Sequence, residues 1–385
     1  MSKYKLGEVC EFINGGAWSD KEYVLSGIPV LKVSNCKNSG FTLDEIDYLP
    51  EESRDKYSKN ELKLGDVIIA TVGSHPNLKE SAAGRSCVVN GSVEGFFLNQ
   101  NAVCVRTTNQ EIVDQKYLGY LAASFPFQHH IQMRGRGAAN QMRIAIGSIK
   151  EYEHSFPEIR TQQRIAGIIS AYDDFIENNQ KQIKLLEEAA QRLYKEWFID
   201  LRFPGHESTP IHDGIPDGWE RKAVTDLLEI KYGKDHKALT DGAIPVYGSG
   251  GIMRKVEPVL YSGESVLIPR KGSLNNILYV TGDFWTIDTM FYSVPKAPNI
   301  AKYMYLFLSR LDMYSFNIGA AVPSMTVKIL DGINVLLPSE EILLRFESVI
   351  SPMFEKKRVL EKQIETSSQA RDRLLPKLMS REIEV

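Results

Sequence analysis

Two long segments of this chain carry apolar residues at alternating spacings of four and three, with charged residues at many positions between them. The seam of the first segment is Ile165, Ile169, Tyr172, Ile176, Asn179, Ile183, Leu186, Ala190, Leu193 and Trp197. This heptad pattern predicts an α-helix over about residues 161–200 with an apolar stripe that seeks a partner helix. At about 1.5 Å per residue, the seam is roughly 50 Å long.

The second segment repeats this pattern at an offset of 181 and predicts a helix over about residues 340–381. Its seam is Phe346, Ile350, Met353, Lys357, Leu360, Ile364, Ser367, Arg371, Leu374 and Leu378. Ser339 is a suitable N-cap before the acidic first turn. Lys357 and Arg371 interrupt the apolar seam, and Asn179 in the first helix is expected to fix its register. An antiparallel coiled coil is the simplest way for the two helices to pair.

The segments before the two helices are also related to each other. Ile28-Pro29-Val30 matches Ile244-Pro245-Val246 at an offset of 216, Gly65-Asp66 matches Gly263-Glu264 at 198, and Pro157 matches Pro338 at 181. The offset shrinks along the globular part and then stays constant, so insertions and deletions are confined to the globular halves. A duplicated unit of this kind presents two related surfaces.

Each globular half combines short apolar runs, typical of strands, with short helical patterns. The runs include residues 67–70 and 266–268, and the helical patterns cover residues 117–124 and 303–311. We therefore expect an α+β protein in which two mixed α/β domains are separated by a long antiparallel two-helix coiled coil, with pseudo-two-fold symmetry. The expected segments are 1–157, helix 158–202, a Pro- and Gly-rich linker 203–217 that crosses irregularly, 218–337 and helix 338–385.

Composition sets limits on the class of protein. The chain has 385 residues, 43% of them hydrophobic, and no apolar run long enough to span a membrane, so we expect a soluble cytoplasmic protein. The net charge of -3 does not identify a nucleic-acid binder, but an acidic remainder can mask a basic face. The widely spaced Cys10, Cys36, Cys87 and Cys104 are interpreted as buried thiols.

Several catalytic motifs are absent from the sequence. The chain has no Pro-Pro, so it lacks the Asn/Asp-Pro-Pro-Tyr/Phe loop of adenine methyltransferases, and no Walker A, HExxH or GxSxG sequence occurs. The adjacent His129 and His130 point in different directions on a helix and have no third ligand nearby, so no metal site is expected. These absences favour a binding subunit over an enzyme.

Two equivalent loops carry glycine together with hydroxyl, amide and basic side chains. One spans residues 70–79 and the other residues 269–276. Such side chains hydrogen-bond to phosphates and base edges, and glycine allows close backbone approach. The alternative is a pair of solvated hairpin turns. The candidate DNA-binding residues in these loops are Thr71, Ser74, His75, Asn77, Lys79, Arg270, Lys271, Ser273, Asn275 and Asn276.

A second candidate segment spans residues 134–143, where arginines surround an Asn-Gln pair. Arg can bind guanine through two hydrogen bonds, and Asn or Gln can bind adenine in the same way. Its candidates are Arg134, Arg136, Asn140, Gln141 and Arg143, and the equivalent segment 317–326 contributes Ser324. The glycine-rich turn at residues 247–251 adds Tyr247 and Ser249, although plain backbone geometry also explains that turn. The mixed charges of the helices suit either solvent or a docked protein.

The helix sequences resemble those of DNA-specificity subunits of type I restriction-modification systems, and the resemblance spans the whole chain. The motifs are Pro157-x-x-x-x-Gln162-x-x-Ile165, Phe-Ile-Glu-Asn-Asn at 175–179, Glu-Trp-Phe-Ile-Asp at 196–200, Arg-Phe-Pro-Gly-His-Glu at 202–207 and Leu-Leu-Pro-Lys-Leu-Met-Ser at 374–380. The second helix departs from the pattern, since Glu340-Glu341 and Leu344-Arg345-Phe346 stand where Glu-Gln and Arg-Ile are commoner.

The resemblance implies two target-recognition domains, each reading one half of a split, asymmetric site in double-stranded DNA. It further implies a non-catalytic chain without a cofactor of its own. Two modification subunits would supply S-adenosylmethionine and methylate adenine, and two restriction subunits would supply ATP- and Mg-dependent translocation and cleavage. A spacer of roughly 50 Å at about 3.4 Å per base pair predicts half-sites about one helical turn apart. The alternative is a scaffold or inactive relative that binds no DNA.

Overall fold

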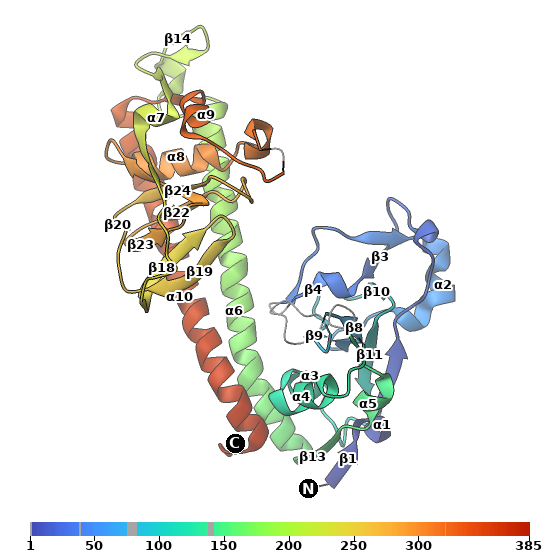
Figure 1. Cartoon of the computed structure of the whole chain (residues 1–385). Helices are drawn as coiled ribbons and strands as arrows, with labels where there is room; N and C mark the ends of the chain where they lie inside the picture. The colour runs from blue at the N-terminus through green and yellow to red at the C-terminus, as the bar shows by residue number, and fades with distance from the viewer. Residues whose placement is uncertain (1, 38–39, 75–82, 138–141, 320) are drawn as a thin grey trace. The chain divides into compact units, whose positions relative to one another are not determined.

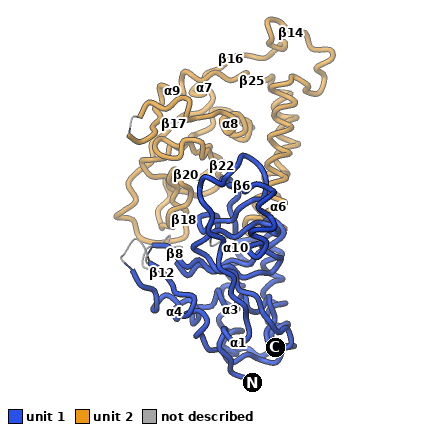
Figure 2. The backbone as a smooth tube through the Cα atoms, turned by 90° about the vertical axis from the view of Figure 1, so that its right-hand side faces the viewer, with its two compact units in different colours: residues 1–177, 364–385 blue, residues 178–363 orange. Residues whose placement is uncertain are grey.

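The computed structural model describes residues 2–37, 40–74, 83–137, 142–319 and 321–385 (Figure 1). The chain forms two compact units, residues 1–177 with 364–385 and residues 178–363, coloured separately in Figure 2. Each unit contains one globular half and part of both long helices.

Unit 1 contains thirteen short strands and five short helices in its described globular part. The strands are β1 (Ser2–Lys5), β2 (Cys10–Asn14), β3 (Ile28–Leu31), β4 (Cys36–Lys37), β5 (Gly40–Phe41), β6 (Asp47–Leu49), β7 (Val67–Ala70), β8 (Val72–Gly73), β9 (Ser86–Val88), β10 (Phe97–Leu98), β11 (Ala102–Thr107), β12 (Met142–Arg143) and β13 (Glu153–Phe156). The helices are α1 (Leu6–Val9), α2 (Arg54–Tyr57), α3 (Gln115–Ala123), α4 (Phe125–Gln132) and α5 (Ile146–Lys150).

Unit 2 has a similar set of elements. The strands are β14 (Ile211–His212), β15 (Ile215–Pro216), β16 (Glu220–Ala223), β17 (Leu228–Tyr232), β18 (Asp241–Gly248), β19 (Gly251–Val256), β20 (Tyr261–Ser262), β21 (Ser265–Pro269), β22 (Leu278–Val280), β23 (Asp283–Thr286), β24 (Met290–Pro295) and β25 (Asn334–Leu337). The helices are α7 (Val224–Leu227), α8 (Ile300–Leu308) and α9 (Val327–Asp331).

Several sheets of the two units share the same strand order. The antiparallel order β2-β11-β7-β9 in unit 1 is repeated as β17-β24-β21-β22 in unit 2. The two-stranded pair β1-β13 is likewise repeated as β16-β25. The parallel pairing of β10 with β3 is repeated by β23 with β18, so the match of Ile28-Pro29-Val30 with Ile244-Pro245-Val246 is confirmed. The duplication predicted from sequence offsets is therefore a duplication of topology.

The long helices are α6 (Ile159–Tyr194) and α10 (Glu340–Ser380), which lie side by side in both units (Figure 1). All twenty predicted seam residues are buried or half-buried. In unit 2 Asn179 contacts Gln363 and Glu187 contacts Lys357, so the helices run antiparallel there. In unit 1 Asp173 contacts Arg371 while Ile165 and Ile169 share a core cluster with Leu378, which is again the antiparallel order. Asn179 is 2% exposed and donates to Oε1 of Gln363 at 3.2 Å, as expected for a residue that fixes register.

The first long helix differs from its prediction at both ends. It begins at residue 159 rather than 161, and after Tyr194 the backbone continues as one π-helical turn, Lys195–Ile199. The wider turn brings the adjacent Trp197 and Phe198 both into the core, where they contact Phe346. The second long helix and the two short helices, α3 and α8, lie within a few residues of their predicted ranges.

The linker is more regular than predicted, because residues 211–216 form the hairpin β14-β15. Phe203, at the start of the linker, is buried against Trp219. All four cysteines are buried free thiols, as predicted. No helix within the described part of the chain has the length and apolarity needed to cross a bilayer.

Candidate nucleic-acid interface

The first candidate loop of unit 1 begins where β7 ends, at one end of the four-stranded sheet. Antiparallel pairing places Ala70 opposite Ala102 and Val103 opposite Asn14, so the turns that follow β2 and β7 lie at the same sheet end as the turn that precedes β11. The backbone N–H of Thr71 donates to the carbonyl of Asn101 at 2.7 Å. This sheet end is where the chain can present turns to a ligand.

A short strand ladder joins the first candidate loop to the arginine-rich segment. In β8 and β12, Val72 lies opposite Arg143, and the N–H of Ile144 donates to the carbonyl of Thr71 at 2.8 Å. Arg136 and Arg143 exchange two backbone hydrogen bonds of 2.9 and 2.8 Å. The structure thus brings together two segments that lie far apart in the sequence.

The side chains on this ladder are basic and accessible. Arg134, Arg136 and Arg143 are exposed, and Nη1 of Arg134 donates to the carbonyl of His130 at 3.2 Å. Thr71 and Ser74 are half-buried. The other predicted residues of these segments, His75, Asn77, Lys79, Asn140 and Gln141, lie outside the described residues.

The same ladder is formed in unit 2 at equivalent positions. Lys271 bridges to Ser324, the N–H of Met325 donates to the carbonyl of Arg270 at 2.9 Å, and the N–H of Gly272 donates to the carbonyl of Pro323 at 2.9 Å. Arg270 occupies the place of Thr71, and Ser324 the place of Arg143. The two loops that the sequence predicted to be equivalent therefore form equivalent backbone hydrogen bonds.

The basic side chains of unit 2 are held by neighbouring groups. The Arg270 guanidinium lies 5.4 Å from the ring centre of Tyr232 and donates to the carbonyl of Asp288 at 3.1 Å. Nζ of Lys271 lies 3.8 Å from the carboxylate of Asp288. Both cations are half-buried, so their positions are more restricted than those of the exposed arginines in unit 1.

The glycine-rich turn at residues 247–251 belongs to the same cluster. Nδ2 of Asn276 donates to the carbonyl of Ser249 at 2.8 Å, and the N–H of Ser249 donates to the hydroxyl of Thr289 at 3.4 Å. Ser273 is exposed. Three predicted segments of unit 2 therefore meet at one end of its sheet.

Two predicted residues have structural contacts of their own. The Tyr247 ring packs edge to face on Phe284, and burial raises the pKa of its phenol. Asn275 donates to Asp312 at 3.2 Å and accepts from the N–H of Met313 at 2.7 Å, which fixes the start of the turn after α8. Both side chains help to shape the cluster.

The turn after β2, and its counterpart after β17, was not among the predicted site segments. A Cβ on Gly15 would lie 1.9 Å from the carbonyl oxygen of Asn99, and one on Gly233 would lie 2.0 Å from that of Ile287. Only glycine fits at either position. The two glycines are related by an offset of 218, close to that of the neighbouring Ile-Pro-Val match, so the repeat contained the signal that could have identified this turn.

The chemistry of both clusters is that of hydrogen-bond donation and positive charge. Over the described ranges, from residue 2 to 385 with their gaps, no three His, Cys, Asp or Glu side chains gather as metal ligands. Guanidinium, ammonium, amide and hydroxyl groups at turn positions can contact phosphates and base edges. The arrangement therefore suits nucleic-acid binding.

Comparison with known proteins adds an independent line of evidence. The model of the family described as "Type I restriction modification DNA specificity domain" matches residues 1–188 and 216–365. The chain is 28% identical over 305 residues to the type I restriction enzyme MjaIX specificity subunit of Methanocaldococcus jannaschii, which covers 71% of this chain and 70% of that protein. It is 20% identical over 418 residues to the HindI specificity subunit of Haemophilus influenzae, covering 85% and 88%.

A solved structure shares the fold. The crystal structure of the type I restriction-modification S subunit from M. genitalium superposes with a TM-score of 0.62 at 19% identity, covering 98% of this chain and 95% of that one. The two matched segments of the family model correspond to the two copies described above.

Proposed function

We propose, since this chain belongs to the family of type I restriction modification DNA specificity domains, that it is the DNA-recognition subunit of a type I restriction-modification system. Each globular half would read one half of a split DNA site. The two helices would set the spacing between the two half-sites.

The observation that carries this proposal is the repeated ladder of backbone hydrogen bonds in the two units. Thr71 with Ile144, and Arg270 with Met325, hold two variable segments side by side at the same sheet end. The frame is constant while its side chains differ, as expected of surfaces that read different base sequences. Arginine and amide side chains each supply about 1–3 kcal/mol of discrimination per good base contact.

Membership of this family supports the following proposal for the partners and the catalytic steps. The chain would be non-catalytic and would assemble with two modification subunits that bind S-adenosylmethionine and methylate adenine. Two restriction subunits, using ATP and Mg, would complete a cytoplasmic complex. The exposed faces of α6 and α10 are the proposed docking sites for the modification subunits.

The test is to bind this chain, together with its modification subunit, to a library of random DNA duplexes and to sequence the retained fraction. We expect enrichment of one bipartite motif with a fixed spacer. A retained fraction without any bipartite motif would refute DNA recognition and favour the scaffold alternative.

Two substitution sets test the assignment of half-sites. Arg134→Ala with Arg136→Ala should relax one half-site, and Arg270→Ala with Lys271→Ala should relax the other. Lys116→Ala with Arg221→Ala is the matched control, because both side chains are exposed and lie on α3 and β16, outside the ladders and the long helices. Loss of both half-sites from either set alone would contradict the assignment.

A further inference from the structure

Two ion pairs join the long helices, and in each the acid lies beside the seam of α6 and the base lies within the seam of α10. Lys357 and Arg371 also contact Glu361 and Asp372 of their own helix. Glu187 contacts Lys357 at 2.6 Å in unit 2, and Asp173 contacts Arg371 at 2.8 Å in unit 1. Both pairs connect the helices across the seam.

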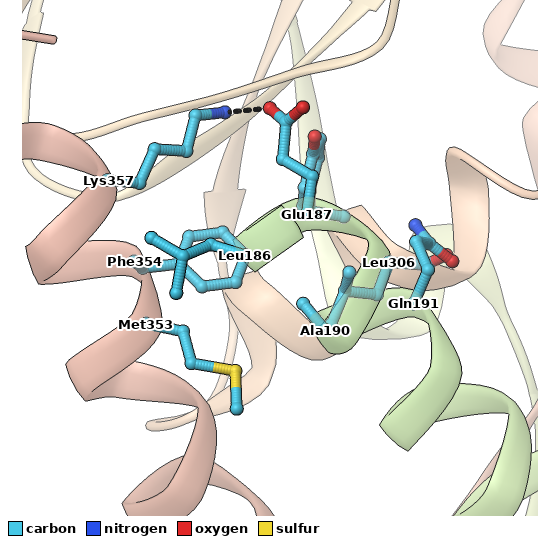
Figure 3. A pocket seen from close by; sticks show the side chains of 9 residues that line it. Leu186, Glu187, Ala190, Gln191, Leu306, Met353, Phe354 and Lys357 are labelled. Carbon is cyan, nitrogen blue, oxygen red and sulfur yellow. Dashed lines mark hydrogen bonds and ion pairs between the residues drawn. The ribbon is translucent and has the colours of Figure 1, made fainter. Parts of the chain in front are cut away.

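The Lys357 side chain is only 25% exposed, and its stem lies over the seam (Figure 3). It borders a small apolar cavity of about 30 Å³, lined by residues that include Ala190, Met353 and Phe354. Burial, the largest single effect, lowers the pKa of Lys357, but the contact with Glu187 together with the charges of Tyr305 and Glu361 outweighs it and the pKa is raised. The ion pair therefore stabilises the charged lysine at a site that water only partly reaches.

The pseudo-two-fold relation does not repeat either pair. Equivalent helix positions are related by an offset of 181, so the counterpart of Lys357 is Ile176 and the counterpart of Arg371 is Ala190. The counterpart of Glu187 is Ser368. Each ion pair is therefore specific to the pairing of α6 with α10.

The offset of 181 also shows which residues would meet if α6 paired with α6 of a second copy in the register of the α6–α10 pair. Glu187 would then lie opposite Ile176, one turn from Asp173 of the second molecule. Carboxylates would thus be gathered on both sides of the seam, with neither Lys357 nor Arg371 there to pair with them. Two α10 helices would likewise bring Lys357 within one turn of Arg371 of the other copy, and like charges at such distances are destabilising.

The contact between the amides of Asn179 and Gln363 does not distinguish α10 from a second α6 as the partner of α6. Gln182 is the counterpart of Gln363, so Asn179 could meet an amide in either pairing. The charged pairs are therefore the groups that tell the two pairings apart. We propose that Glu187–Lys357 and Asp173–Arg371 select α10 as the partner of α6 and exclude a second copy of α6, so that the coiled coil closes within one molecule.

The test uses two full-length variants with different affinity tags. One carries Asp173→Lys and Glu187→Lys, and the other carries Lys357→Glu and Arg371→Glu. Each variant alone has like charges across its own seam, whereas exchange of α10 between the two restores opposite charges at both positions. We expect at least tenfold more mixed-chain product on co-expression than from two differently tagged wild-type chains.

A mixed-chain yield equal to that of the wild-type pair would overturn the proposal. The matched control for the second variant is Lys356→Glu with Arg358→Glu, which reverses two exposed charges on the same helix outside the seam. This control should leave the mixed-chain yield at the wild-type level.

Thermal unfolding of single chains gives a second measure. Each double variant should unfold at a lower temperature than the wild type, and the chain with all four reversals should recover most of the loss. Because Asp173 also accepts from the hydroxyl of Tyr120 at 2.7 Å, Tyr120→Phe measures that separate contribution. No recovery in the fourfold variant would overturn the proposal. Neither readout involves DNA, so failure here leaves the recognition proposal intact.

Discussion

The two units build the same ladder but place positive charge on opposite sides of it. In unit 1 the base is Arg143 on β12, facing Val72, whereas in unit 2 it is Lys271 on the first segment, facing Ser324. Backbone hydrogen bonds hold both ladders, so side chains can change without changing the frame. A recognition surface can therefore vary in sequence while its position on the sheet stays constant.

The two units also anchor an equivalent acid differently, buried in unit 1 and half-buried in unit 2. Asp66 in unit 1 accepts from Nε and Nη2 of Arg106 on β11, at 2.6 and 2.7 Å. Its counterpart Glu264 accepts from Lys302 on α8 at 2.8 Å, and the same ammonium contacts Glu347 of α10 at 2.6 Å. Asp66 is thus held by a cation of its own sheet, whereas Glu264 is connected through Lys302 to the long helix α10.

The helix entries differ in the same way. Gln162 is fully buried and makes three hydrogen bonds, to the carbonyls of Ile112 and Pro157 and from the N–H of Asp114. Its counterpart at the helix offset of 181 is the apolar Leu343. One topology therefore tolerates either a polar or an apolar connection between domain and helix.

The largest expected effect is that of Arg106→Leu, which would leave Asp66 buried without its cation. Breaking a buried pair from one side costs about 3–5 kcal/mol. Denaturant unfolding measures the loss, with the fluorescence of Trp18 as the probe of unit 1 and that of Trp219 and Trp285 as the probe of unit 2. The counterpart Lys302→Leu should cost less, because the Glu264 side chain is 39% exposed and that of Asp66 only 4%. The reverse order would contradict this comparison.

Gln162→Leu should destabilise unit 1 by about 2–3 kcal/mol, because it leaves two carbonyls and one N–H without partners in the interior. The same denaturant titration measures the change. Leu343→Met is the control in unit 2, where a swap of similar volume should cost less than about 1.5 kcal/mol. Equal losses would mean that the hydrogen bonds of Gln162 contribute nothing beyond packing.

Acid should weaken unit 1 before unit 2. Burial, with a smaller effect from the charge of Arg381, lowers the pKa of His154 to about 4 from 6.5, and its Nε2 lies 2.9 Å from the hydroxyl of Tyr117. The unfolded chain binds this proton first, so the stability from neutral His154 is present above about pH 6.5 and is lost as the pH falls towards 4.

The counterpart of His154 is Val335, which does not titrate. Hydrogen-exchange protection of β13 relative to β25 should therefore fall on acidification, by about 3 kcal/mol over that range. His154→Gln should remove most of this difference. A ratio that is independent of pH in the wild type would refute the assignment.

The smallest effect concerns charge on the ladder. Arg143→Ser should reduce the salt dependence of DNA binding by about one phosphate contact, and Ser324→Arg should increase it by about the same amount. Binding to a duplex at several salt concentrations measures both slopes, with Arg160→Ser as the control. Unchanged slopes in both variants would remove the ladder from the DNA contact surface.

The sequence predicted the elements that rest on local periodicity. The heptad seam identified both long helices and their register, because burial repeats every turn. The repeat offset identified equivalent loops. The hydrogen bonds between Thr71 and Ile144 were beyond prediction, since they join segments far apart in the chain. The π-helical turn was not predicted either. Trp197 fits the heptad pattern, and no feature of the neighbouring sequence indicates that Phe198 is buried.

The anchoring partners could not be predicted either. The match of Gly65-Asp66 with Gly263-Glu264 identified equivalent acids, but the cations come from different elements, β11 and α8. Of the candidate side chains, those on the ladders lie together, and Tyr247 and Asn275 turned out to have packing and capping contacts as well.

The pairing of β1 with β13, and of β16 with β25, pins the entrance and exit of each globular half next to one another. Ser2 lies opposite Phe156 and Glu220 opposite Leu337. The first and last strands of each globular half are thus paired with each other. The chain therefore leaves the half next to where it entered, whatever the number of residues between these two strands. Residues can be gained or lost between the two paired strands without shifting the first turn of the long helix that follows.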